Sequence, residues 1–301
     1  MTERLFEVAG SAAPEGMTTH AVEETAKARS ITHRRIVLLV AYDGTDFHGF
    51  AEQSSEAIPT VGGALRKALS RVAGEDVTLT CAGRTDKGVH ALGQVVHSDL
   101  PADLVGRLAE KDGELERLAR SLSGQCGPSV SVRRVALAPD GFDARHSARS
   151  RRYRYELLVT PYADPLWRHR SWHVPDELDI SAMRVAADGL LGEHDFSAFC
   201  RRPPGQDGPL TRRVIDARFD RLQDPARLGF EIEANAFCHQ MVRSIVGHLV
   251  AVGEGRLPAV TLRCCLERPE RSAAAAPAPR EGLVLLYVTY PEELVASGRF
   301  G

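Results

Sequence analysis

The stretch CAGRTDKGVHALGQ, residues 81–94, places an arginine, an aspartate, a lysine and a histidine within seven positions. It joins two segments with the character of strands, VTLTCA at 77–82 and VHALGQVVHSDL at 89–100. Because an aspartate followed two residues later by a glycine favours a tight reversal, GRTDKG predicts a hairpin turn. Arg84 and Asp86 would share one side of an extended chain, so that the guanidinium would keep the carboxylate ionised. An ionised, oriented carboxylate can act as a nucleophile or a base.

Further elements are predicted on both sides of this turn. Residues 34–42 form an apolar run that ends in a DG turn signal, as a strand would. Thr60 is placed to cap a helix whose apolar residues recur on one face, and Gly74 would end it. The spacing of Leu and Ala over 104–122 predicts another helix, and 130–137 reads as a strand. The first half therefore has the order βαββαβ.

The same order is predicted after residue 150, without any repeat of sequence. The second half has predicted strands at 151–159, 212–222, 228–236 and 282–290, helices at 180–191 and 237–252, a short extra strand at 169–174 and a short extra helix at 259–267. We therefore predict an α+β fold of two ferredoxin-like units, with a ligand cleft between them. The expected division is a disordered tail at 1–32, one half at 33–145 and another at 146–301.

Composition narrows the class of protein. Of 301 residues, 43% are hydrophobic and 26% charged, which suits a globular protein with one large core or two modest ones. The apolar runs are strand-sized, far below the ~18 residues of a membrane helix, and no secretory signal opens the chain. The six cysteines show no CxxC spacing, which argues against a disulfide framework and a zinc site. We expect no metal and a reducing cytoplasm.

The net charge of −2 conceals local clusters of arginine. Residues 145–154 carry five arginines, and residues 201–218 carry five more. Such clusters favour phosphate binding, although a solvated surface in an arginine-rich chain is the alternative. The candidate phosphate contacts are Arg145, Arg149, Arg151, Arg152 and, from the turn, Lys87.

Several polar and aromatic residues are ambiguous from pattern alone. Tyr153 shares a strand face with Tyr155 and Leu157, which favours core packing, but a tyrosine beside a basic cluster can also stack on an exposed base. Arg243 lies off the apolar stripe of its predicted helix, where plain solvent exposure is the simplest interpretation. Four histidines share no motif and are interpreted as structural or surface residues: His90, His97, His239 and His248.

Motifs that are absent exclude some functions. The sequence has no GxGxxG after a strand, no GxxxxGK[ST] and no GxSxG, so nucleotide-cofactor and serine-hydrolase functions lose support. An aromatic RNP1 signature is also absent, which weakens a plain RNA-recognition module.

The stretch GRTDKGVHALGQVVH closely resembles the signature of the tRNA pseudouridine synthase A (TruA) family, G-R-T-D-x-G-V-H-A followed by Q-V. Five further stretches match the family in the same order: YDGTDFHGF, FDARHSARSRRYRY, HDFSAF, EANAFCHQMVRSIVGHL and EGLVLLYVTYP. Together these stretches cover residues 36–291. Six blocks in the family's order make chance resemblance implausible.

This resemblance implies a cofactor-free isomerase that converts uridine to pseudouridine in the anticodon stem-loop of tRNA, at about positions 38–40. It also implies a continuous, mostly antiparallel sheet, a central basic cleft and a homodimer bridged by tRNA. By motif, Asp86 corresponds to the catalytic aspartate, and Tyr153 to the residue that stacks on the target uracil. Arg243 corresponds to the helix arginine that pairs with the carboxylate, and Arg84 fits a role in holding the RNA. Attack by Asp86 and removal of a sugar proton both remain open as its role.

The sequence departs from the family pattern at a few positions. Lys87 stands where the family commonly has alanine, and Gln240 and Ser244 stand where it has histidine and asparagine. Lys87 would add a phosphate contact or lower the pKa of the carboxylate. A divergent paralogue that modifies another uridine, and a catalytically silent RNA-binding protein, are the alternative functions.

Overall fold

The computed structural model describes residues 32–53, 55, 57–111, 114–202, 205 and 207–295. The tail predicted at 1–32 therefore lies outside the described residues, apart from Thr32. Among the described residues, no helix combines the length and the hydrophobicity needed to cross a bilayer.

The first half follows the predicted order of strands and helices, except that one predicted helix is divided in two. They are β1 (His33–Tyr42), α2 (Val61–Ala73), β2 (Thr80–Cys81), β3 (His90–Pro101), α3 (Ala102–Glu110), α4 (Glu114–Cys126) and β4 (Val130–Leu137). The predicted caps of α2 are confirmed: the Thr60 side chain accepts a hydrogen bond from the Gly63 amide, and Gly74 ends the helix with a φ of 75°.

The second half repeats the order with additional short elements. It contains β5 (Ser150–Val159), η1 (Pro165–Trp167), β6 (Trp172–Val174), α5 (Ile180–Asp188), β7 (Gly192–Asp195), η2 (Ser197–Phe199), β8 (Thr211–Arg221), β9 (Arg227–Ala234), α6 (Met241–Gly253), α7 (Val260–Glu267), η3 (Arg271–Ala273) and β10 (Leu283–Thr289). The sequence pattern did not predict β7 or the three 3-10 helices η1, η2 and η3.

Two predicted elements of the first half differ from the structure for local reasons. Of the strand predicted at 77–82, only Thr80–Cys81 is a strand. The residues ahead of Thr80 make main-chain hydrogen bonds with polar side chains instead of with a neighbouring strand. The Val77 amide donates to the Ser70 hydroxyl, and the Thr78 carbonyl accepts from the Ser98 hydroxyl. The single helix predicted at 104–122 is instead the pair α3 and α4, since Lys111 is extended and ends α3.

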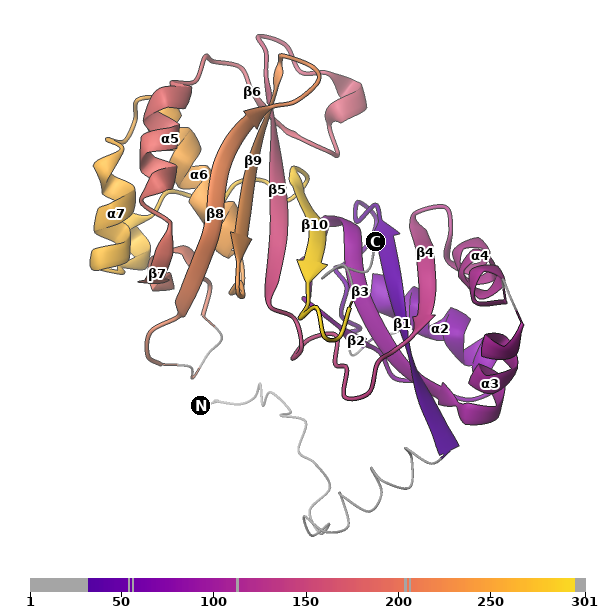
Figure 1. Cartoon of the computed structure of the whole chain (residues 1–301). Coiled ribbons are helices and arrows are strands. Elements are labelled where there is room, and N and C mark those ends of the chain that lie inside the picture. Colours follow the sequence, from indigo (N-terminus) through magenta and orange to yellow (C-terminus); the bar gives the residue numbers. More distant parts are fainter. Residues whose placement is uncertain are drawn as a thin grey trace, which may run out of the picture.

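A single large sheet connects the two halves in the described part of the chain (Figure 1). Its strand order is β4-β1-β3-β10-β5-β9-β8-β7, with β2 added to β3 and β6 added to β5. The pairs are antiparallel except for β10 with β3 and β5 with β6, so the sheet is mostly antiparallel as expected. The last strand, β10, lies between β3 and β5 and is what makes the sheet continuous.

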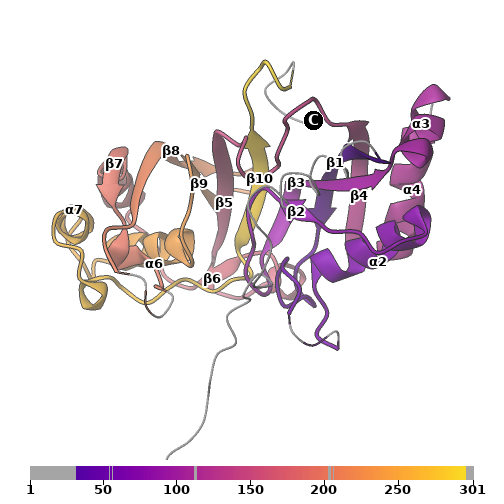
Figure 2. The same cartoon turned by 90° about the horizontal axis from the view of Figure 1, so that it is seen from below.

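Helices from both halves cover the same side of this sheet. Figure 2 shows α2 and α6 on one side of the strands. The turn after β2 and the loop before α6 approach each other on this side, because residues from both line one cavity. The fold therefore brings the conspicuous turn at 82–89 against the second half of the chain.

Candidate active site

The turn between β2 and β3 carries Asp86 on a fixed backbone. The Val89 amide donates a hydrogen bond to the Asp86 carbonyl at 3.2 Å, which closes a tight turn, and Gly88 has a φ of 75° that favours glycine. Thr85 is buried, whereas Arg84 is exposed and Asp86 is partly exposed. The hairpin turn predicted from GRTDKG is therefore present, with Thr85 facing inward and its two charged neighbours on the opposite side.

Asp86 lies in a cavity of about 820 Å³ that both halves of the chain line; we call it the Asp86 cavity. This volume falls within the range of pockets that hold nucleotide-sized ligands. The first half contributes the turn around Asp86, and the second half contributes the segment 236–243 at the start of α6 together with Tyr153 of β5. The arginines among the lining residues are Arg84, Arg145, Arg151, Arg212 and Arg243.

His239 is the residue that approaches the Asp86 carboxylate most directly among the described ion pairs. Its Nε2 lies 3.5 Å from Asp86 Oδ1, and both side chains keep access to solvent. No ion pair joins Asp86 to Arg84 or Arg243 in the described part of the chain, so these predicted pairings of the carboxylate are not present in this structure. His239, interpreted from the sequence as a structural or surface residue, is exposed and also lies in the wall of the cavity.

The backbone before α6 aims His239 toward the turn. Gln240 adopts a left-handed conformation with a φ of 65°, which few residues other than glycine adopt. It is the last residue of the loop and directly precedes Met241, the first residue of α6. The His239 carbonyl accepts a hydrogen bond from the Arg201 amide at 2.9 Å. The helix predicted at 237–252 therefore begins only at Met241, and the loop ahead of it supplies a site residue.

Arg243 lines the Asp86 cavity one turn further along α6. Its Nε donates to the Ala278 carbonyl at 2.8 Å, and the Ala278 amide donates to the Arg243 carbonyl at 2.9 Å. This segment can approach the helix closely because a Cβ at Gly247 would lie 2.0 Å from the Ala276 carbonyl oxygen. Arg243 is therefore held beside the cavity by the connection that precedes β10.

Tyr153, on β5, lines the cavity and is only 7% exposed. Its ring packs edge to face on Phe237, with the ring centroids 5.0 Å apart. Burial raises the pKa of the Tyr153 phenol well above its usual range; the charge of Arg151 opposes this shift, and that of Asp86 adds to it. Tyr153 is therefore a neutral aromatic surface close to the Asp86 carboxylate.

Side chains alternate between the two faces of β5, so the predicted phosphate contacts Arg151 and Arg152 lie on opposite faces of this strand. Arg151 points into the protein beside Tyr153 and donates to four main-chain carbonyl groups, of Ala82, Arg145, Ala148 and Asn235. Burial lowers its pKa, but its donors are fully engaged within the protein. Arg151 therefore connects the two halves rather than offering a free guanidinium to a phosphate.

We expect Arg151→Leu to destabilise the fold by about 3 kcal/mol or more, because several buried carbonyl groups would lose their donor at once. Urea unfolding followed by circular dichroism measures this loss. Arg149→Leu is the matched control, since Arg149 is 62% exposed and the ion pair that it forms with Glu293 spans 3.7 Å. Equal stability of the Arg151 and Arg149 variants would contradict the structural role of Arg151.

Arg152 lies on the opposite face of β5, outside the lining of the Asp86 cavity. Its guanidinium pairs with Glu231 at 3.0 Å, with Glu233 at 2.8 Å and with Asp216 at 2.7 Å. Although burial acts to lower the pKa of Arg152, these carboxylates raise it above its ordinary value. The prediction of a phosphate contact is not supported for Arg152, because three carboxylates neutralise its charge.

The remaining predicted phosphate contacts are exposed. Arg145 lines the Asp86 cavity, whereas Arg149 and Lys87 do not. The Lys87 ammonium lies 2.9 Å from His48 Nε2, on the loop that follows β1. Of the exposed candidates, Arg145 is the one placed at the cavity itself.

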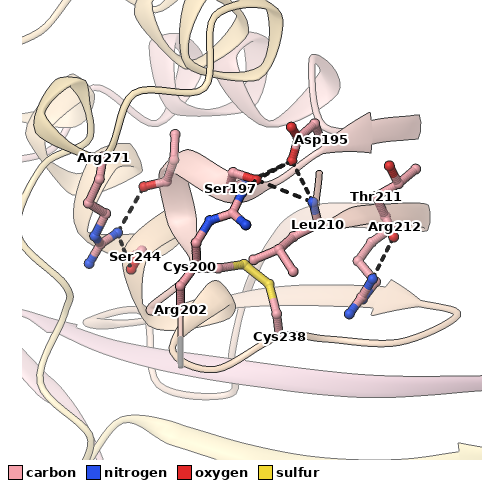
Figure 3. Close-up of a disulfide and its surroundings, with 11 residues drawn as sticks. Asp195, Ser197, Cys200, Arg202, Leu210, Thr211, Arg212, Cys238, Ser244 and Arg271 are labelled. Carbon is pink, nitrogen blue, oxygen red and sulfur yellow. Dashed lines mark hydrogen bonds between the residues drawn. A yellow bond between two sulfur atoms is a disulfide. The ribbon is translucent and has the colours of Figure 1, made fainter. Parts of the chain in front are cut away.

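The cysteine spacing argued against a disulfide framework, and the described residues contain one disulfide. Cys200 and Cys238 form this disulfide, with their Cα atoms 5.9 Å apart (Figure 3). Cys81, Cys126, Cys264 and Cys265 are free. The two cysteines are 38 residues apart in sequence, so local cysteine spacing could not predict this disulfide. Cys238 lines the Asp86 cavity next to His239, and the bond fastens this loop to the segment after η2.

No cluster of three or more His, Cys, Asp or Glu side chains is arranged to hold a metal ion within the described ranges. The groups that line the Asp86 cavity include a carboxylate, an imidazole, a neutral tyrosine and guanidinium groups.

Comparison with known proteins settles the family. A family model described as tRNA pseudouridine synthase matches residues 38–123 and 186–291, which is more than half of the chain. The chain belongs to the tRNA pseudouridine synthase family. The matched ranges contain Arg84, Asp86, His239 and Arg243, whereas Tyr153 lies between them.

Curated relatives extend the match over most of the chain. A tRNA pseudouridine synthase A from Frankia casuarinae is 47% identical over 262 residues, covering 86% of this chain and 90% of the relative. One from Leifsonia xyli subsp. xyli is 43% identical over 269 residues, covering 85% and 92%. A crystal structure of a Cbf5-Nop10-Gar1 complex aligns with a TM-score of 0.32 at 10% identity, covering 84% of this chain and 59% of that chain. As a tRNA pseudouridine synthase, the chain is an isomerase that acts on tRNA.

Proposed function

We propose that the Asp86 cavity converts uridine to pseudouridine in the anticodon stem-loop of tRNA, at about positions 38–40, with Asp86 as the catalytic carboxylate. The main support for this proposal is the set of side chains that surround Asp86. In a tRNA pseudouridine synthase, the signature aspartate lies in a nucleotide-sized cavity whose opposite wall supplies an imidazole, an arginine and a neutral tyrosine.

The reaction breaks the bond between N1 of the base and C1′ of the sugar, turns the base, and joins C5 to C1′ with loss of the C5 proton. A covalent route and a route through removal of a sugar proton both begin with ionised Asp86. The imidazole of His239, whose Nε2 lies 3.5 Å from Asp86 Oδ1, provides a hydrogen-bond donor beside this carboxylate. Arg243, at the same cavity, adds positive charge after water has been displaced.

The target base must leave its stack to enter the cavity, which costs a few kcal/mol and less in a loop or at a stem end. Tyr153 offers its ring to the base once it has left, and stacking on an aromatic ring contributes about 1–3 kcal/mol. Arg84, exposed at the cavity, is placed to hold the RNA next to the extruded nucleotide.

The arginines around the Asp86 cavity support a central basic cleft for the RNA backbone. We expect tRNA binding to weaken steeply with salt, since each phosphate neutralised by an arginine releases counterions. In filter-binding titrations, Arg84→Gln and Arg145→Gln should each make the slope of log K against log salt shallower by about 1. Lys67→Gln is the control, because Lys67 is not among the residues that line the cavity. A flat salt response of the wild-type protein would contradict a cleft that follows the phosphates.

Strand order supports the division into two ferredoxin-like halves, residues 33–145 and 146–301. Without the additional strands β6 and β7, the first half runs β4-β1-β3-β2 and the second runs β10-β5-β9-β8, so both have the order fourth, first, third, second. We further propose a homodimer bridged by tRNA, acting in the cytoplasm where its substrate is. Sedimentation velocity with and without tRNA tests the dimer, and a monomer under both conditions would exclude it.

The choice of uridine separates the leading function from a divergent paralogue. Purified enzyme and an unmodified tRNA transcript should yield pseudouridine in the anticodon stem-loop, which primer-extension mapping after carbodiimide treatment locates. Pseudouridine elsewhere would identify the paralogue. Tight tRNA binding with no pseudouridine at any position would favour the silent RNA-binding protein.

A further inference from the structure

A chain of buried hydrogen bonds lies directly beneath the turn that carries Asp86. The Tyr42 hydroxyl, at the end of β1, lies 2.8 Å from the Thr85 hydroxyl. The Gln94 amide, on β3, donates to the Gly83 carbonyl at 2.7 Å and to the Tyr42 hydroxyl at 3.4 Å. Tyr42 is 4% exposed, Thr85 6% and Gln94 0%, so water does not compete for these bonds.

The orientation of the Gln94 amide follows from the Gly83 carbonyl. A carbonyl only accepts, so the amide nitrogen must face it, and the second hydrogen of that nitrogen then reaches Tyr42. The Gln94 Oε1 that remains is buried without a partner among the described residues. A buried, unpaired amide oxygen destabilises a fold, so an apolar side chain would suit this position better if packing were its only task.

The main chain of the same turn is held from its other side by the loop after β1. The Phe50 amide donates to the Thr85 carbonyl at 3.1 Å, and the Gly88 amide donates to the Phe47 carbonyl at 3.2 Å. Gly49 has a φ of 98°, and a Cβ there would lie 2.6 Å from the Thr85 carbonyl oxygen. Thr85 is thus fixed through both its carbonyl and its hydroxyl, one residue before Asp86.

We propose that Tyr42, Thr85 and Gln94 form a positioning brace that fixes the Asp86 turn for the chemical step. This inference rests on the proposed function, because it assigns the brace a role only through the Asp86 carboxylate. Tyr42 and Gln94 lie outside the lining of the Asp86 cavity, whereas Thr85 belongs to it. Together the three side chains set the position of the carboxylate relative to the sugar. A displacement of about 1 Å at a reacting group costs about 100-fold in rate, so loss of the brace would be visible in catalysis.

The test uses variants that each remove one hydroxyl with little change of shape, Tyr42→Phe and Thr85→Val. We expect each to lower the single-turnover rate about 10- to 100-fold while the Kd for tRNA changes by less than about twofold. Thr85→Ser keeps the hydroxyl and should restore most of the rate. The double variant should be no slower than the worse single variant, because both remove the same bond.

Tyr290→Phe is the matched control. Tyr290 is 2% exposed, its hydroxyl donates to the Ala144 carbonyl at 2.8 Å, and it does not line the Asp86 cavity. Its rate should stay at the wild-type value. A wild-type rate in Tyr42→Phe and Thr85→Val, or an equal loss in Tyr290→Phe, would overturn the brace. Asp86→Asn, measured in parallel, tests the proposed function separately: activity in that variant would refute the catalytic carboxylate, whatever the brace variants show.

Discussion

Replacing Asp86 with asparagine should lower the single-turnover rate of pseudouridine formation by about 10⁴-fold or more, because the amide is neutral and can neither attack carbon nor accept a proton. The side chains have almost the same shape, so the turn should keep its fold. The affinity for tRNA should change little, since the arginines of the cavity remain in place. Chromatography of nucleosides from digested tRNA measures the rate, and filter binding measures the affinity.

Asp46→Asn is the matched control for this variant. Asp46 belongs to the nearby DGTD turn, is exposed, and does not line the Asp86 cavity. We expect it to retain the wild-type rate. If Asp46→Asn and Asp86→Asn lost the same fraction of activity, the effect would be one of local charge, and Asp86 would have no special role.

The second large effect is expected at Tyr153. Tyr153→Leu should lower the rate about 100-fold, because the base would lose an aromatic surface that contributes about 1–3 kcal/mol. Tyr153→Phe keeps the ring and its edge-to-face contact with Phe237, and it should stay within about threefold of wild type. Single-turnover rates measured well below the unfolding temperature of each variant make the comparison.

The two Tyr153 variants also separate stacking from hydroxyl chemistry. The phenol pKa is raised by burial, so the hydroxyl stays protonated at neutral pH and is available only as a hydrogen-bonding group. Were Tyr153→Phe as slow as Tyr153→Leu, the hydroxyl itself would take part in the reaction. Stacking would then not be the main role of this residue.

Local sequence pattern predicted the strands and helices that depend on nearby residues. The run at 34–42 is β1, and the caps at Thr60 and Gly74 bound α2, because alternation and capping act over a few residues. Alternation along β5 also separates Arg151 and Tyr153, which face the cavity, from Arg152 on the other face. Applied to the arginines, the same rule would have removed Arg152 from the phosphate contacts.

Contacts between the halves could not be predicted from local pattern. His239 lies close to Asp86 because β10 pairs with β3 and so packs the second half of the chain against the first. These two strands are far apart in the sequence. The sequence feature that could have identified His239 is its position in FCHQMVRS, directly before the helix that carries Arg243. The Cys200–Cys238 disulfide likewise depends on how the loop before α6 packs against η2, which cysteine spacing does not encode.

Arg243 shows how a motif can identify a residue without giving its contacts. The resemblance implied that it pairs with the carboxylate, yet its Nε bonds to the Ala278 carbonyl, and His239 is the group beside Asp86. Both residues line the same cavity, so motif and structure agree on the site and differ on the pairing.

Tritium release tests the central claim most directly. Forming a bond at C5 of uridine expels the hydrogen at that carbon, so tRNA labelled with [5-³H]uridine should release tritium in step with pseudouridine formation. We predict release by the wild-type protein and, from equally well bound tRNA, none above background by Asp86→Asn. No release by the wild-type protein, or release by Asp86→Asn at the wild-type rate, would contradict the account.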